Sequence, residues 1–353
     1  MKNLALFIDG TDNDGERDLP RGEATNVYKL YKMCGEPNPF YFRGVGSGRL
    51  GALGGSTGFG TKRRLRLAYK YLVENYEPGD SIYLFGFSRG AFAVRLLAGF
   101  LGYVGTLFGR PPFEDYLPHV YQIYESSVAL DVVDSFRHYL EALTENRPEP
   151  LPIHFIGVWD TVERYFPVRD LPEIKKLPSH ITHARHALAI HERRNEMTPT
   201  LWTGWEETST VEQVWFPGAH ADVGGGYKQD KLSMAPLEWM CGEASSKGLN
   251  LSGLSGNQKD RIPHQQRTDF PGSGKILPRL EGEFIRDALK TTTSPVIDSM
   301  GVHQTARDHL GPNPIPTTNI TFSKHFSAID KQNAIKELAN VDKEARGLMG
   351  RVK

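Results

Sequence analysis

Cysteine, net charge and long apolar runs are all scarce in this chain. The two cysteines, Cys34 and Cys241, are too few for a disulfide framework and lack the spacing of metal ligands, so we expect folding in a reducing compartment. Lysine plus arginine and aspartate plus glutamate count 42 each, and this balance argues against a nucleic-acid-binding protein and against a polybasic membrane anchor. No window approaches about 18 consecutive apolar residues, so we expect no transmembrane helix.

We also expect no secretion signal at the N-terminus. The apolar residues 4–8 are too few for the apolar segment of a signal peptide, and they run directly into Asp9 and Gly10 rather than a small-residue cleavage site. We therefore expect residues 4–8 to form a first strand and the protein to be synthesised in the cytoplasm.

The chain does contain an alternation of short apolar runs with stretches of helical periodicity. The runs typical of buried strands are 4–8, 40–45, 82–87, 153–159 and 211–216, and the helical stretches are 62–76, 89–101, 117–144, 181–194, 234–247 and 331–348. Such alternation predicts an α/β fold, with a mostly parallel sheet that is covered by helices on both faces.

The motifs that carry chemistry all lie before residue 230, which favours one decorated catalytic domain over two domains. We place this domain at residues 1–310. Residues 249–321 are rich in Gly, Pro, Ser, Thr and Asn and contain few apolar runs, so we expect an irregular decoration or a cap to begin near residue 249. Residues 311–353 are expected to follow as a tail with one helix.

Residues 86–90 read Gly-Phe-Ser-Arg-Gly and form the most informative motif in the sequence. A strand-like run precedes the motif and helical composition follows it, which is the context of a nucleophile elbow. Glycines two positions before and after Ser88 suit that strained turn, because the backbone and the following helix pack too closely there for a Cβ atom. Ser88 is therefore the candidate nucleophile. The alternative is a serine in an ordinary Gly-rich turn between a strand and a helix.

A serine hydroxyl is a poor nucleophile until a base takes its proton, so Ser88 requires a histidine. Doubly wound hydrolases present these groups in the order serine, acid, histidine, each at the carboxyl end of a strand. His220 follows the strand-like run 211–216, and its Pro and Gly neighbours place it on a loop rather than in a core. His220 is therefore the candidate base.

The histidine in turn needs an acid that holds its tautomer. Asp160 directly follows a strand-like run and lies between the serine and the histidine in the chain. The alternatives are Asp222, two residues beyond the histidine, and Asp9 at the end of the first strand, while Asp160 itself could serve as a helix N-cap. The preferred triad is Ser88, Asp160 and His220.

An oxyanion formed at Ser88 needs two hydrogen-bond donors. In this architecture one donor is the backbone N–H of the residue after the nucleophile, here Arg89, and the other comes from an earlier strand-to-helix loop. We expect Gly10 or Thr11 to supply the second donor. Asp9 and Asp222 are expected to support the site by accepting backbone N–H groups in their Gly-rich turns.

Two further patterns suggest other chemistry but are weaker. Residues 55–62 nearly copy a phosphate-binding loop within the Gly-rich segment 44–60, but the lysine follows the threonine and no buried strand precedes the loop. Four histidines recur at helical spacing without a zinc-binding H-E-x-x-H motif: His180, His183, His186 and His191. We therefore expect no metal and no cofactor, and we expect the segment 44–60 to be a loop or lid.

Six motifs follow one another along the chain. They are Phe-Ile-Asp-Gly-Thr at 7–11, Tyr-Phe-Arg-Gly-Val-Gly at 41–46, Gly-Phe-Ser-Arg-Gly-Ala-Phe at 86–92, Gly-Val-Trp-Asp-Thr-Val at 157–162, Ala-Arg-His-Ala-Leu-Ala-Ile at 184–190 and Phe-Pro-Gly-Ala-His-Ala-Asp-Val-Gly-Gly-Gly-Tyr at 216–227. With these motifs the chain resembles, over residues 3–310, the α/β-hydrolase catalytic domain of the type VI secretion phospholipase effectors.

The resemblance implies a serine esterase that cleaves acyl chains from glycerophospholipids, with Ser88, Asp160 and His220 at the family's motif positions. It also implies a lipid or other ester substrate, transient contact with a membrane surface, a delivery or immunity protein as partner, and export by a system that reads no signal peptide. The large membrane-docking module of some members is not evident after residue 310. Two other functions compete with an esterase: a nucleotide- or phosphate-binding module, and a catalytically inactive hydrolase-like scaffold.

Overall fold

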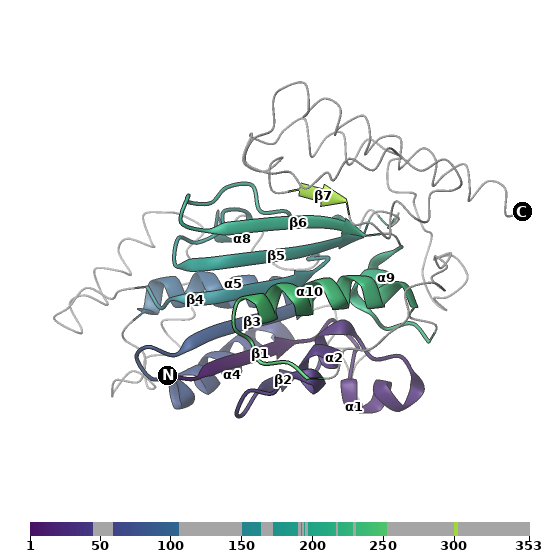
Figure 1. Ribbon diagram of the computed structural model, residues 1–353, viewed down its shortest axis with the longest axis horizontal. Helices are drawn as coiled ribbons and strands as arrows, with labels where there is room; N and C mark the ends of the chain where they lie inside the picture. The colour runs from purple at the N-terminus through teal and green to yellow at the C-terminus, as the bar shows by residue number, and fades with distance from the viewer. Residues whose placement is uncertain are drawn as a thin grey trace, which may run out of the picture.

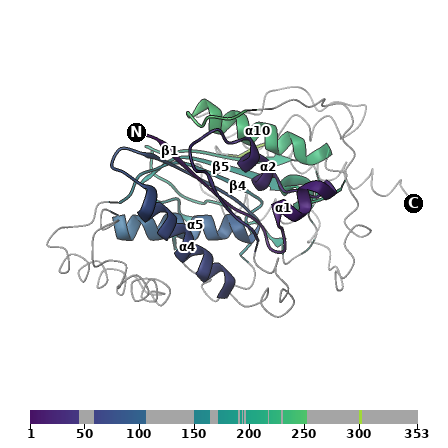
Figure 2. The same ribbon diagram turned by 90° about the horizontal axis from the view of Figure 1, so that it is seen from below.

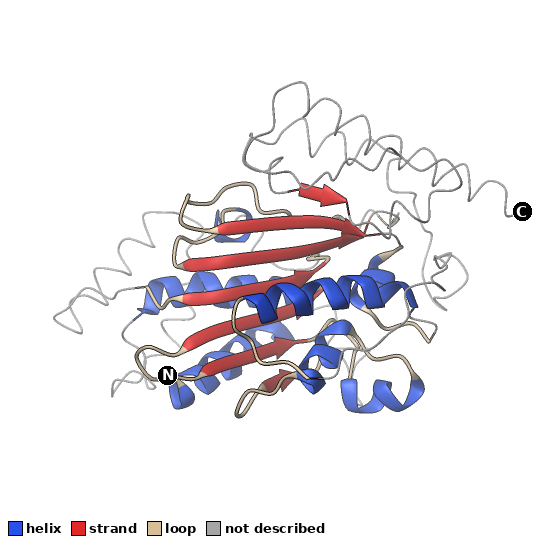
Figure 3. Ribbon diagram, in the orientation of Figure 1, coloured by secondary structure: helices blue, strands red, loops and turns tan. Residues whose placement is uncertain are grey.

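The computed structural model describes residues 1–44, 59–105, 150–163, 172–189, 192, 194, 197–216, 218–228, 231–252 and 300–302. Seven strands from these ranges form one sheet in the order β2-β1-β3-β4-β5-β6-β7, and every neighbouring pair is parallel. They are β1 (Asn3–Ile8), β2 (Phe40–Phe42), β3 (Ser81–Phe87), β4 (Ile153–Trp159), β5 (Ile181–Ala189), β6 (Thr210–Phe216) and β7 (Met300–Val302). The strands all point to one edge of the sheet, so their carboxyl ends meet there (Figure 1 and Figure 3).

Helices cover both faces of the sheet, as a parallel sheet requires. The helices α4 (Phe59–Asn75) and α5 (Arg89–Val104) lie on one face, and α2 (Asn26–Met33) and α10 (Met234–Ser246) lie on the other (Figure 2). The shorter elements are α1 (Gly15–Asp18), η1 (Leu19–Arg21), α8 (Pro172–Lys175), α9 (His220–Gly224) and η4 (Lys231–Ser233). This arrangement confirms the predicted α/β fold of the hydrolase-like type.

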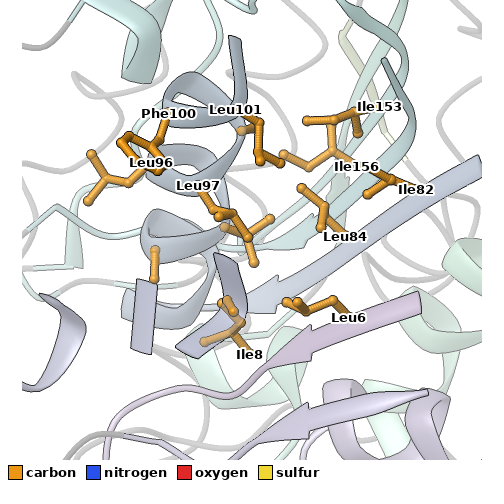
Figure 4. Packing of buried hydrophobic residues seen from close by; sticks show 14 of the residues in the cluster. Leu6, Ile8, Ile82, Leu84, Leu96, Leu97, Phe100, Leu101, Ile153 and Ile156 are labelled. Atoms are coloured by element: carbon orange, nitrogen blue, oxygen red, sulfur yellow. The ribbon is translucent and has the colours of Figure 1, made fainter. Parts of the chain in front are cut away.

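Alternation of side chains along the strands divides the core between the two faces of the sheet. In β1, Leu6 and Ile8 belong to the cluster beneath α5, whereas Ala5 and Phe7 belong to the cluster beneath α2 and α10. Figure 4 shows Leu97 of α5 in the same cluster as Leu6 and Ile8. Full burial of each such aliphatic side chain stabilises the fold by about 1.5–3 kcal/mol.

Most of the predicted elements are present close to their predicted bounds. The confirmed strands and helices are β1, β3, β4, β6, α4, α5 and α10, and the strand predicted at residues 40–45 is the short β2, which ends at Phe42. The helices predicted at 117–144 and 331–348 lie outside the described residues, as does most of the Gly-rich segment 44–60.

The helix predicted for residues 181–194 is wrong, because residues 181–189 form β5 between β4 and β6. The strand reads Ile-Thr-His-Ala-Arg-His-Ala-Leu-Ala, so it shows neither the apolar run typical of a central parallel strand nor the regular alternation of a half-buried one. Residues three apart on a strand point to opposite faces, so His183 and His186 do not share one. Among the described residues, which exclude His191, no group of three or more His, Cys, Asp or Glu side chains could hold a metal ion.

The elements that were not predicted from the sequence include α2 and β7, besides the short helices α1, η1, α8, α9 and η4. Thr25 caps α2 by accepting a hydrogen bond from the Tyr28 N–H. The strand β7 pairs with β6, so part of the region predicted to be irregular extends the sheet. In the described part of the chain, no helix combines the length and the apolarity needed to cross a bilayer.

Candidate active site

Ser88 occupies a strained turn between β3 and α5. Its backbone has φ 57° and ψ −124°, a conformation that residues with a Cβ atom rarely adopt. A Cβ atom on Gly90 would lie 2.3 Å from the carbonyl oxygen of Ile8, and one on Gly86 would lie 2.7 Å from the Cα atom of Ala91. The two glycines of the motif are therefore required for β1, β3 and α5 to pack around the serine.

The Ser88 turn lies at the point in the sheet where the order of the strands changes direction. From β1 the chain passes to β2 on one side, and β3 lies on the other side of β1. In open α/β sheets the crevice outside the carboxyl ends of the strands at such a point is the usual place for a ligand. The Ser88 N–H donates to the carbonyl oxygen of Trp159, which also ties this turn to the end of β4.

Asp160 and His220 form a buried hydrogen-bonded pair at the same edge of the sheet. The His220 Nδ1 atom lies 2.6 Å from the Asp160 Oδ2 atom, and the Asp160 side chain has no exposed surface. The other carboxylate oxygen, Oδ1, accepts the Ala189 N–H at 3.1 Å. Both oxygens of Asp160 are thus engaged, and one of them fixes the rotation of the imidazole.

His220 is the first residue of α9 and is 6% exposed. The sequence-based placement on a loop outside the core is therefore wrong, because the adjacent segment folds back against the end of β3. The Phe87 ring lies 4.6 Å from the His220 ring, centroid to centroid. A Cβ atom on Gly224 would lie 2.0 Å from the Phe87 ring, so this glycine lets α9 approach the residue that precedes Ser88.

Asp222 braces the entrance to α9. Its Oδ2 atom accepts the Ala219 N–H at 2.8 Å, which satisfies one of the backbone donors at the start of a helix. The hydrogen bond that the structure gives the His220 Nδ1 atom goes to Asp160. Of the alternative acids considered from the sequence, Asp160 is the one that contacts the imidazole in this way.

Asp9, at the end of β1, is buried and accepts three hydrogen bonds. The donors are the Gly10 N–H and the hydroxyls of Thr25 and Tyr41, each at 2.7 Å. Burial raises the pKa of Asp9 to about 6, although the hydrogen bonds from these three donors act in the opposite direction. The carboxylate therefore ties the first loop to α2 and to β2.

The loop after Asp9 is a tight turn. The Asn13 N–H donates to the Gly10 carbonyl oxygen at 3.2 Å, and Asp12 has φ 64°. The hydroxyl oxygen of Thr11 is buried and has no hydrogen-bond partner among the described residues. Gly44 packs directly on this turn, because a Cβ atom there would lie 1.6 Å from the Gly10 carbonyl oxygen.

Glu192 is a residue of this edge that the sequence analysis missed. Its Oε2 atom accepts the His220 N–H at 3.1 Å and lies 2.9 Å from the Arg194 guanidinium. Burial alone would raise the pKa of Glu192, but hydrogen bonds and charge from Arg194, with a smaller effect of His220, lower it to about 2. One sequence signal could have indicated Glu192: the charged residues 192–194 come shortly after the end of a central strand. The predicted helix over residues 181–194 hid this signal, because it placed Glu192 inside a helix.

The segments that follow five strands, β1, β3, β4, β5 and β6, thus contribute side chains to one edge of a parallel sheet. The fold and this edge define an α/β-hydrolase-like domain. The chain belongs to the family described as the T6SS phospholipase effector Tle1-like catalytic domain, whose model matches residues 2–243. The matched range includes Ser88, Asp160 and His220.

The chain is also similar to an uncharacterized protein of Saccharomyces cerevisiae (strain ATCC 204508 / S288c), with 31% identity over 231 residues, which are 57% of this chain and 33% of the yeast protein. An uncharacterized protein from Pseudomonas aeruginosa matches with 18% identity and a TM-score of 0.38, over 71% of this chain and 47% of that one. The Tle1 effector bound to the VgrG spike of the type 6 secretion system matches with 17% identity and a TM-score of 0.32, over 64% and 51%. This chain therefore spans a third to a half of the length of these relatives.

Proposed function

We propose that the protein is a serine esterase that hydrolyses the acyl ester bonds of glycerophospholipids. The observation that carries the proposal is the buried hydrogen bond between His220 and Asp160, at the edge of the sheet where Ser88 occupies the strained turn. Membership of a family of phospholipase effector domains supports the choice of a phospholipid as the substrate.

The chemistry follows from the pairing of these side chains. The hydrogen on His220 Nδ1 points at Asp160, so the other ring nitrogen, Nε2, is free of its proton and acts as the base. The Ser88 Oγ atom attacks the ester carbonyl carbon as its proton passes to Nε2. The intermediate then expels the alcohol, which takes that proton. Water repeats the sequence on the acyl-enzyme and releases the fatty acid and Ser88.

The oxyanion formed in each step requires donors aimed at it. The Arg89 N–H follows the nucleophile at the start of α5, where the helix dipole also favours negative charge. The Gly10 N–H already donates to the Asp9 carboxylate, which favours Thr11 as the source of the second donor. The buried hydroxyl of Thr11, without a partner among the described residues, adds a further donor at this turn.

The family also suggests the protein's surroundings. The proposal includes transient contact with a membrane surface, export by a secretion system, and a delivery or immunity protein as partner. These follow from the family of effectors and are separate from the proposed chemistry.

Replacement of the nucleophile tests the reaction. We expect Ser88→Ala to reduce the release of fatty acid from phosphatidylcholine micelles by more than about a thousandfold, because the acyl-enzyme can no longer form. Ser246→Ala, on an exposed side chain of α10, is the matched control and should leave the rate unchanged. Full hydrolysis by the Ser88→Ala protein would show that the proposed mechanism is wrong.

A further inference from the structure

The backbone of His220 is held by a side chain that the proposed triad does not include. Asp160 fixes the ring through Nδ1, but the ring can be placed correctly only if the Cα atom that carries it is also fixed. The backbone N–H of His220 belongs to the first turn of α9, where helix N–H groups have no partner within the helix. Glu192 accepts this N–H at 3.1 Å.

Glu192 is itself rigidly held. Its Oε1 atom accepts the Arg194 N–H at 2.8 Å, its Oε2 atom lies 2.9 Å from the Arg194 Nη2 atom, and its side chain has no exposed surface. A buried carboxylate with these partners stays ionised, because the hydrogen bonds and the positive charge of Arg194 lower its pKa. The anion lies next to the residue on which positive charge develops during the reaction.

We propose that Glu192, held by Arg194, is a positioning residue that fixes the His220 backbone and favours the protonated imidazole. The inference rests on the proposed function, in which the His220 ring takes the proton of Ser88. Asp160 and Glu192 then act from two sides, one on the ring and one on the backbone.

The titratable groups on α9 and on the elements around it have hydrogen-bond partners of their own. Asp9 accepts the Thr25 hydroxyl, Asp160 accepts the Ala189 N–H, and Asp222 accepts the Ala219 N–H. On β5, which packs against α9, His183 contacts Thr210, Arg185 contacts Glu243, and His186 accepts the Thr161 N–H. A change confined to position 192 therefore leaves the contacts of these groups in place, and a shift in the pH profile reports on Glu192.

The substitution Glu192→Gln keeps the size of the side chain and an acceptor oxygen, but it removes the charge. We expect kcat/KM to fall about tenfold, and we expect the acid limb of its pH profile to move down by about half a pH unit or more, because the imidazolium loses a nearby anion. A loss of structure alone would lower the active fraction without moving the limb. An unmoved acid limb would overturn the inference.

Glu243→Gln is the matched control, because Glu243 also pairs with an arginine, Arg185 of β5, but contacts that strand instead of His220. It should leave the acid limb in place. Glu192→Asp keeps the charge and shortens the side chain, so kcat/KM should fall several-fold with the limb unmoved. If Glu192→Gln fails to fold, a wild-type kcat/KM in Glu192→Asp still overturns the inference.

Failure of this inference and failure of the proposed function give different results. If Ser88→Ala and His220→Ala abolish hydrolysis but the acid limb of Glu192→Gln matches the wild type, only the inference fails. If Ser88→Ala stays active, the proposed function fails. NMR titration of the His220 imidazole, assigned by its absence in His220→Ala, tests Glu192 without catalysis, and the midpoint should move to lower pH in Glu192→Gln.

Discussion

Backbone strain marks the proposed catalytic residues at the scale of single residues. The non-glycine residues with positive φ in the described chain are Asp12, Asn38, Ser88 and Asp160. Such conformations cost about 1–3 kcal/mol each and persist where the surrounding structure fixes them. Ser88 and Asp160 both directly follow a buried strand of the central sheet.

The buried carboxyl of Asp9 gives the stability of the protein a defined pH dependence. The pKa of Asp9 is about 6 in the fold against an ordinary value of 3.8, so the folded state holds this proton over a pH range in which the unfolded chain has lost it. The stability contributed by the protonated carboxyl is complete below pH 3.8 and is lost as the pH rises through about 6.

The substitution Asp9→Asn removes this linkage. Relative to Asp9→Asn, the free energy of unfolding of the wild type should fall by about 2 kcal/mol as the pH rises from 4 to 7. Urea unfolding at a series of pH values measures the difference. Asp12→Asn, on an exposed side chain of the same turn, serves as control. If the curves of wild type and Asp9→Asn run parallel across this range, Asp9 does not titrate as described.

The residues of the site differ in how far the sequence could identify them. Ser88 was predicted from its glycines, and Asp160 and His220 from chain order, because these are local features next to strand ends. Glu192 could not be assigned, because its contact with the His220 backbone depends on residues 28 positions apart being brought together. The hydrogen bond from the Gly10 N–H to the Asp9 carboxylate also could not be predicted, because it depends on the rotamer of Asp9, which no local sequence pattern specifies.

At the scale of elements, close contacts between backbones decide how the elbow is built. A Cβ atom on Gly90 would lie 2.3 Å from the Ile8 carbonyl oxygen and 2.5 Å from the Asp9 carbonyl oxygen. Both are main-chain atoms, one in the last residue of β1 and one in the residue after it, so they cannot move aside without distorting the sheet. The first turn of α5 can therefore approach β1 only with glycine at this position.

The substitution Gly90→Ala should destabilise the protein by about 2–3 kcal/mol or more and displace the start of α5. Gly242→Ala is the control, because Gly242 lies inside α10 with no atom within 4 Å of an added Cβ. It should be neutral or stabilise the fold by up to about 1 kcal/mol. Denaturant unfolding measures both changes. Equal stability of the two variants would contradict the packing described at the elbow.

The elements that sequence periodicity identified differ in their residue patterns from those that it missed. The helices α4, α5 and α10 were predicted because their periodicity extends over several turns. The strand β5 was mistaken for a helix because His183, Arg185 and His186 interrupt its apolar residues, and the spacing of three between the two histidines fits one face of a helix. The strand β7 has three residues, too few for any periodic signal, and its pairing with β6 depends on distant sequence.

At the scale of the whole molecule, the order of the strands brings the site together. The strands β1, β3 and β4 are neighbours and end in Asp9, the elbow and Asp160. The chain returns after β6 to place His220 against the end of β3. Parallel strands were expected from the alternation of apolar runs and helices, and they gather these groups at one edge because all of their carboxyl ends lie there.

The claim on which the account depends is that His220, held by Asp160, activates Ser88. A fluorophosphonate probe tests it directly, since such probes phosphonylate activated serines, with loss of fluoride, far faster than unactivated ones. Peptide mass mapping of the labelled protein should find the adduct on Ser88, and His220→Ala should slow its formation by more than about a hundredfold. An adduct formed as rapidly without His220, or no adduct on Ser88 in the wild type, would contradict the account.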